Sequence, residues 1–208
     1  MVDEITIGSI DFPDVKCGFI GEIGCQYPLQ DFERRSILAA AETQEATGAP
    51  VGFHPGRDPE SPFEIMRIFT EAGGNAKKSV VGHLESTIFQ FKLFYTYKIL
   101  TSILGTIKDE GLLADFATEF GSYCQFDLFG IENSYYQIKP SIDFYSDAQR
   151  ISLIQSLIGD GFEDKILISQ DIHTKHRTVR YQKNLKSEPS DNNFDFRKSM
   201  EDMDTNIF

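Results

Sequence analysis

The chain has 208 residues and is acidic, with 32 Asp and Glu against 20 Lys and Arg and a formal net charge of −12. This charge argues against nucleic acids and anionic membrane surfaces as partners, because both repel an acidic protein that has no basic patch. The three cysteines have no CxxC spacing, which favours a reducing, cytoplasmic setting. The acidic first 15 residues do not have the basic and then apolar pattern of a secretory signal.

Short apolar runs alternate with longer stretches of helical spacing, a pattern that predicts βα units and a parallel sheet. We expect a strand over 16–24 and a helix over 31–47, then a strand over 50–55 and a helix that opens with a capping box at 61–64 and stops at 73–74. Further strands are predicted over 79–84, 123–130 and 165–172, with helices over 109–120 and 146–159 between them.

Two stretches depart from this alternation. Residues 86–107 form an aromatic and aliphatic run that Lys92 and Lys98 interrupt. Two charges inside about 20 apolar residues argue against a membrane span. The interval from His83 to the strand-end Asp127 is 44 residues, and removing about 20 residues of this run restores one βα unit, so the run behaves like an insertion. Residues 181–208 have low hydrophobicity, mixed charge and no periodicity, and we expect them to be disordered.

Four residues with metal-ligand chemistry, Glu22, His54, His83 and Asp171, each follow a predicted strand and precede a turn. The carboxyl ends of parallel strands meet at one edge of a sheet, so these side chains should converge. The intervals Glu22–His54 and His54–His83 are 32 and 29 residues, close to one βα unit of an eight-unit barrel of about 250 residues. Imidazole and carboxylate together suit Zn²⁺, although each residue taken singly also fits a core or capping role.

Five motifs carry a resemblance to the phosphotriesterase-related proteins of the amidohydrolase superfamily. They are GEIGC at 21–25, HPGR at 54–57, GHLE at 82–85, FDLFG at 126–130 and QDIHTK at 170–175. The resemblance covers about residues 14–85 and 108–180. It implies a (β/α)8 barrel, a centre of two divalent metal ions, usually zinc, and a small-molecule substrate.

The resemblance also implies a role for each matching residue. Glu22 resembles the carboxylate that bridges both ions, which is a carboxylated lysine in bacterial phosphotriesterases. His54 and His83 would hold the more exposed ion, while Asp171 would bind the buried ion and shuttle the proton of the attacking hydroxide. The implied pocket candidates are Arg57, Tyr136, Gln137 and His173.

The chain also departs from the family pattern. The sequence contains no His-x-His pair, which binds the buried ion in the family. The matching motifs correspond to about strands four to eight, so we expect a chain truncated at both ends. The predicted fold class is therefore α/β, a partial TIM (β/α)8 barrel of the metal-dependent hydrolase type over residues 1–180, with an insertion at about 86–107 and a disordered tail over 181–208.

The predicted function is a zinc-dependent hydrolase that acts on ester, phosphoester or amide bonds through a metal-bound hydroxide. Two alternatives stay open: an amidase or lactonase for small N-acyl or lactone substrates, and a catalytically impaired fragment or pseudoenzyme without the His-x-His ligands. A TatD-like nuclease shares the Glu, His, His, Asp series, but the HLEST and SQDIHTK segments and the acidic charge fit that group poorly. A form anchored to a membrane by residues 86–107 ranks last, and the sequence leaves the oligomeric state undecided.

Overall fold

The computed structural model describes residues 1–84, 111–131 and 144–172. Backbone contacts divide the chain into Met1–Asp171 and Ile172–Phe208, and the described helices and strands all belong to the first unit. In chain order they are α1 (Val2–Thr6), β1 (Ile20–Gly24), α2 (Asp31–Thr47), β2 (Val51–His54), α3 (Glu60–Glu71), η1 (Ala76–Lys78), β3 (Ser79–Val81), α6 (Leu112–Phe120), β4 (Tyr123–Phe126), α7 (Asp147–Gly159), η3 (Glu163–Lys165) and β5 (Ile166–Ile168).

The five strands form one parallel sheet in the order β1-β2-β3-β4-β5, so the predicted sheet of βα units is confirmed. The register pairs Gly24 with His54 and Phe53 with Val81. The carboxyl ends of β1, β2 and β3 therefore lie at the same edge of the sheet, where the candidate ligands were expected.

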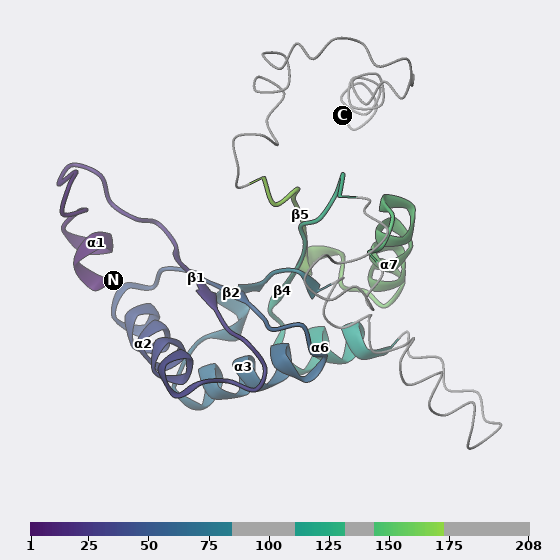
Figure 1. The fold of residues 1–208 in the computed structure, drawn as a ribbon, viewed down its shortest axis with the longest axis horizontal. Helices are drawn as coiled ribbons and strands as arrows, with labels where there is room; N and C mark the ends of the chain where they lie inside the picture. Colours follow the sequence, from purple (N-terminus) through teal and green to yellow (C-terminus); the bar gives the residue numbers. More distant parts are fainter. Residues whose placement is uncertain (85–110, 132–143, 173–208) are drawn as a thin grey trace, which may run out of the picture. The chain divides into compact units, whose positions relative to one another are not determined.

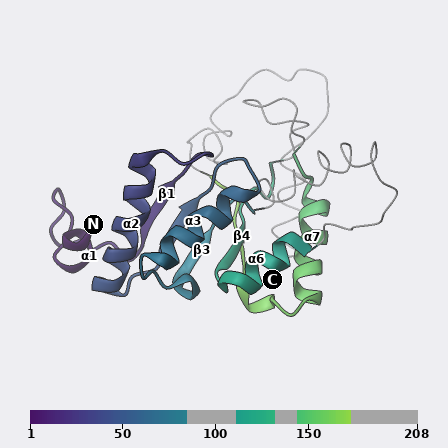
Figure 2. The same cartoon turned by 90° about the horizontal axis from the view of Figure 1, so that it is seen from below.

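The helices α2, α3 and α6 follow one another along the sheet (Figures 1 and 2). The core lies between them and the strands. Its aromatic contacts join β2 to α3 through Phe53 and Phe69, whose ring centroids are 5.0 Å apart, and α3 to α6 through Phe63 and Phe116 at 5.4 Å. All four rings are buried, and the edge-to-face arrangement is one that aromatic rings prefer in a core.

Two predicted helix boundaries have a clear physical cause. Helix α2 ends at Gly48, whose φ of 70° is the left-handed conformation that favours glycine at a helix C-terminus. Helix α7 begins with the capping box of Ser146 and Gln149, in which each side chain binds the other residue's backbone N–H.

The predicted capping box at 61–64 is wrong. Helix α3 begins at Glu60, and the backbone N–H of Glu60 donates to Asp58 Oδ1 at 3.0 Å. Because Asp58 already satisfies this end of the helix, Ser61 is free for another contact, and its Oγ accepts a hydrogen bond from the backbone N–H of Gly56 at 2.9 Å. The fully buried Ser61 thus ties the loop after β2 to α3.

The strands are shorter than predicted: β1 begins four residues later, at Ile20, whereas β3, β4 and β5 end earlier because their last predicted residues leave the ladder. His83 follows β3 and Asp127 follows β4. The backbone N–H of His83 donates to the side-chain carboxylate of Asp127 instead of to a strand carbonyl. The short helix α1 was not predicted. The expected insertion at 86–107 and the tail at 181–208 lie outside the described residues, and among the described helices none is long and apolar enough to cross a membrane.

Candidate metal centre

Three of the four predicted ligands meet at the carboxyl edge of the sheet. One ligand atom each of Glu22, His54 and His83 lies within 4.8 Å of the other two. Glu22 belongs to β1, His54 ends β2 and His83 follows β3 by two residues. Two imidazoles and a carboxylate form a donor set that suits Zn²⁺, and ligands about 2 Å from a common ion would need only small side-chain adjustments from this spacing.

An irregularity in β1 places Glu22. Between the pairs Ile20–Val51 and Ile23–Phe53, β1 has one residue more than β2. Such a bulge re-aims a side chain and is frequent beside functional sites. It allows Glu22 to approach the histidines although the neighbouring Ile23 continues the strand.

Gly82 provides room for the carboxylates at the centre. A Cβ at this position would lie 2.8 Å from Asp127 Oδ2 and 3.4 Å from Glu22 Oε1. A side chain at residue 82 would therefore displace the Asp127 carboxylate and contact Glu22, which is a steric reason for glycine in the GHLE motif.

His83 is held by a carboxylate that the sequence did not assign to the site. Its Nδ1 lies 2.6 Å from Asp127 Oδ1, and both residues are buried. The rings of His54 and His83 are edge to face, with centroids 4.4 Å apart. Because Nδ1 is engaged with Asp127, the ring atom that His83 offers to a metal is Nε2.

The surroundings of Glu22 shift its pKa upward. Partial desolvation is the main cause, and the carboxylates of Asp127 and Asp171 add to it, while His83 acts in the opposite direction. A metal ion at this position would relieve the same unfavourable electrostatics, because it neutralises converging carboxylates.

The two histidines are shifted in opposite directions. Burial lowers the pKa of His54, and the nearby charges of His83 and Arg57 lower it further. Burial also acts to lower the pKa of His83, but the hydrogen bond and the charge of Asp127 outweigh this effect, so that pKa is raised. His54 is thus a neutral imidazole at neutral pH, the form that binds metals.

Asp171 follows β5 and is close enough for its charge to raise the pKa of Glu22. It does not belong to the group of described residues whose ligand atoms lie within 4.8 Å of one another. Its φ of 49° is left-handed, as is the φ of 54° at His83. The predicted pocket residues Tyr136, Gln137 and His173 lie outside the described ranges.

A pocket of about 440 Å³ adjoins the cluster at His54. The loops after β1 and β2 form it, and its lining consists of Cys25, Gln26, Tyr27, His54, Pro55, Gly56, Arg57 and Asp58. The predicted pocket candidate Arg57 is among these residues. The two loops are in close contact, since a Cβ at Gly56 would lie 2.6 Å from the backbone nitrogen of Tyr27.

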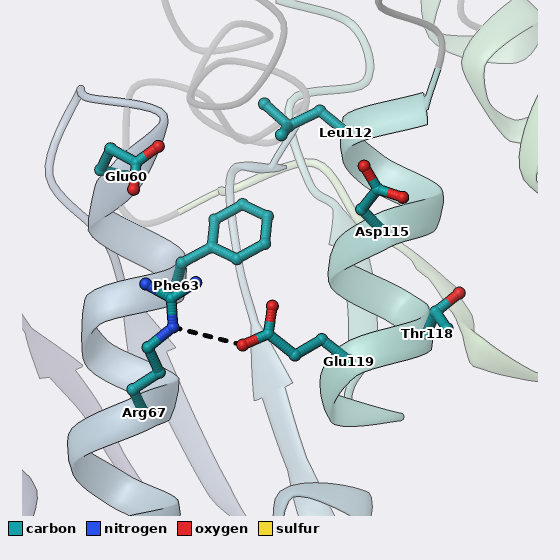
Figure 3. Close-up of a pocket in the computed structure, with 7 residues that line it drawn as sticks. All are labelled: Glu60, Phe63, Arg67, Leu112, Asp115, Thr118 and Glu119. Atoms are coloured by element: carbon teal, nitrogen blue, oxygen red, sulfur yellow. Dashed lines mark hydrogen bonds and ion pairs between the residues drawn. The ribbon is translucent and has the colours of Figure 1, made fainter.

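A second pocket of about 440 Å³ lies between α3 and α6, and it contains none of the candidate ligands (Figure 3). Its lining combines Phe63 with charged side chains, among which Arg67 Nε and Glu119 Oε1 form an ion pair at 3.2 Å. This pair is largely exposed and its partners satisfy each other. We therefore place the candidate site at the cluster of Glu22, His54 and His83.

The fold and the site define a class: a β/α-barrel protein with metal-ligand side chains at the carboxyl ends of its strands. The chain belongs to the phosphotriesterase family, whose model matches residues 1–100 and 96–186. It is 48% identical over 167 residues to the phosphotriesterase-related protein of Drosophila mojavensis, covering 80% of this chain and 42% of that protein. The chain thus spans less than half the length of this relative.

Solved structures of phosphotriesterase homologues resemble the fold of this chain. The phosphotriesterase homology protein of Escherichia coli, complexed with phosphate in its active site, matches with a TM-score of 0.62 and 25% identity over 88% of this chain and 52% of that one. A resiniferatoxin-binding protein of Rhodobacter sphaeroides matches with a TM-score of 0.69 and 24% identity over 87% of this chain and 45% of that one. The five-stranded sheet is therefore part of a TIM-type barrel, as predicted.

Proposed function

We propose that this chain supplies a metal-binding part of a zinc-dependent hydrolase that acts on an ester, phosphoester or amide bond of a small molecule. The observation that carries the proposal is the convergence of Glu22, His54 and His83 within 4.8 Å at the carboxyl edge of the sheet. Membership of the phosphotriesterase family supports the hydrolase class. The phosphate in the active site of the Escherichia coli relative supports the phosphoester among these three substrate classes.

Each residue has a role that follows from its surroundings. The neutral imidazole of His54 and Nε2 of His83 are the nitrogen donors, and Glu22 is the oxygen donor. A zinc ion held by them supplies Lewis acidity and lowers the pKa of water. Asp171, beside Glu22, accepts the proton of the attacking water, and Arg57 orients the substrate from the pocket next to His54. The resemblance adds Tyr136, Gln137 and His173 as further pocket residues.

Zinc affinity tests the ligand set. In competition with a chromophoric chelator, the chain is expected to bind zinc, and His54→Ala, His83→Ala and Glu22→Gln should each weaken binding by about a hundredfold, since each removes one of three donors. Glu71→Gln is the matched control, because Glu71 is exposed at the far end of α3. Equal affinity in all variants would contradict the assignment.

Hydrolysis tests the reaction separately. The zinc-loaded chain should cleave p-nitrophenyl ester, phosphotriester or anilide probes faster than His54→Ala does. Zinc binding without cleavage of any of the three probes would leave the metal site standing and reject the reaction for this chain.

A further inference from the structure

We propose that Asp127 is a positioning residue that fixes the His83 ring so that Nε2 faces the metal. The inference rests on the proposed zinc site, and no motif or comparison assigns this role to Asp127. It starts from the position of Asp127, one residue beyond β4 and 44 residues after His83 in the chain.

Asp127 holds His83 at two places. One carboxylate oxygen lies 2.6 Å from the ring Nδ1, and both oxygens accept the backbone N–H of His83 at 3.2 Å. Contacts to the backbone and to the end of the side chain together fix the direction of the ring. The same contacts hold the left-handed backbone of His83, a conformation that a residue with a side chain adopts only when its surroundings enforce it.

Asp127 is itself fixed from the other side. Gln125 Nε2 donates to Asp127 Oδ2 at 2.8 Å, and the absent side chain at Gly82 leaves space for this oxygen. The carboxylate is 2% exposed, so water does not compete for these contacts. With both oxygens engaged by Gln125 and His83, the geometry favours a supporting role for Asp127 over direct coordination of a metal.

The contact with Asp127 decides which ring nitrogen carries the proton. A neutral imidazole that donates Nδ1–H to a carboxylate has its lone pair on Nε2, the nitrogen that Asp127 does not contact. The carboxylate also increases the basicity of that lone pair. Partners of this kind behind a metal-binding histidine typically change metal affinity by about 10–100-fold.

The tautomer of His83 in the metal-free chain is the direct readout, measured by ¹⁵N–¹H two-bond correlation NMR above the titration range of the ring. Wild type and Asp127→Asn, which keeps a carbonyl acceptor, should show the Nδ1–H tautomer. Asp127→Ala should shift His83 toward the Nε2–H tautomer. Asp115→Ala is the matched control, since Asp115 is an exposed acid on α6 and should leave the spectrum unchanged.

Zinc affinity is the second readout. The zinc affinity of Asp127→Ala should be about 10–100-fold below that of wild type, and the affinity of Asp127→Asn should lie between the two. If Asp127→Ala retains both the wild-type tautomer and the wild-type affinity, the inference is wrong. If both variants lose affinity equally while the tautomer stays unchanged, Asp127 is a direct ligand and the inference is also wrong.

The two proposals can fail separately. If the wild-type chain binds no zinc, the proposed function fails, while the tautomer in the metal-free chain still decides whether Asp127 orients His83. If Asp127→Ala does not fold, wild type is compared with Asp127→Asn and Gln125→Ala to decide whether Asp127 orients His83. Removing the Gln125 side chain loosens the Asp127 carboxylate but leaves that carboxylate in place.

Discussion

His83 and Asp171 are the two non-glycine residues of the described part that have a left-handed backbone. Each follows a strand and was predicted as a ligand from that position. A left-handed residue with a side chain costs on the order of 1–3 kcal/mol and persists where the surrounding structure enforces it, often at a functional site. For His83, the enforcing group is the buried carboxylate of Asp127.

Gly82→Ala tests the steric basis of the centre. The added methyl group would lie 2.8 Å from Asp127 Oδ2, so this carboxylate must move, and 3.4 Å from Glu22 Oε1, at van der Waals contact. We expect a loss of about 1–3 kcal/mol in the free energy of unfolding, measured in urea, together with weaker zinc binding. Gly159→Ala is the control, because a Cβ there meets no atom within 4 Å. Unchanged zinc affinity in Gly82→Ala would contradict the tight packing of the acids.

For single residues, the sequence predicted the convergence of three candidate ligands and missed the contacts that hold them in place. Glu22, His54 and His83 could be found because strand ends recur at one βα interval. The contact of Asp127 with His83 could not, since it joins residues 44 apart and depends on the direction of two side chains. The bulge that aims Glu22 is a property of pairing between two strands, and no residue of β1 signals it alone.

Helix α7 is fastened to the loop that follows β4. Asp147, its first residue, accepts the backbone N–H of Gly130 at 3.0 Å and lies 2.6 Å from Arg150 Nη1. The fully buried Arg150 also donates through Nη2 to the carbonyl of Ile131 at 2.9 Å. This loop begins with Asp127, so the packing of α7 stabilises the segment that positions His83.

Asp147→Ala should therefore destabilise the fold strongly. It removes the Asp147 carboxylate from the buried guanidinium of Arg150, and breaking a buried ion pair typically costs about 3–5 kcal/mol, toward the lower end here because Asp147 is 20% exposed. Urea unfolding measures the loss. Asp164→Ala, which removes a 72% exposed acid that lies 3.7 Å from Lys165, should change stability by less than about 1 kcal/mol. Similar losses in both variants would show that Asp147 acts only as a surface charge.

Element boundaries were predictable where a local signal exists. The bounds of α2 match the prediction because Gly48 stops it, and α7 starts where its capping box predicts. The start of α3 was misplaced because Asp58 and Ser61 both have N-cap chemistry, and only the fold shows that Ser61 Oγ binds Gly56 instead. Strands were predicted too long, β1 at its start and β3 to β5 at their ends, since hydropathy does not show where ladder hydrogen bonds begin and cease.

Thiol labelling tests whether the whole unit is folded. Burial raises the pKa of Cys25 and Cys124 to about 12, and Glu33 and Glu64 contribute to the shift at Cys25. Because the thiolate is the nucleophile, neither should react with iodoacetamide at pH 8, whereas the exposed Cys17 should. Mass spectrometry should find one label in the native chain and three in guanidinium chloride. Equally fast labelling of Cys124 and Cys17 would contradict the closed packing of β4.

The outer strands make self-association a testable property. Within the described sheet, β1 pairs only with β2 and β5 only with β4, and Ile168 of β5 is 58% exposed. An exposed apolar edge strand favours pairing between copies, which an edge lysine opposes. We expect Ile168→Lys to reduce self-association in light scattering. Ser152→Lys adds the same charge on the exposed side of α7, and an equal effect there would show that charge alone is responsible.

At the level of the molecule, the sequence predicted a parallel sheet of five strands and its place in a partial barrel. Both followed from the regular alternation of apolar runs and helical stretches. The predicted insertion at 86–107 and the tail at 181–208 stay predictions, because they fall outside the described residues.

The order of the strands in the sheet is the same as their order in the chain. From β2 onward, each new strand of the described sheet therefore finds a partner that is already synthesised. This arrangement suits vectorial folding on the ribosome, where the N-terminal part of a chain emerges first. Docking of β3 would then bring His83 to Glu22 and His54, and docking of β4 would add Asp127, which fixes the His83 ring.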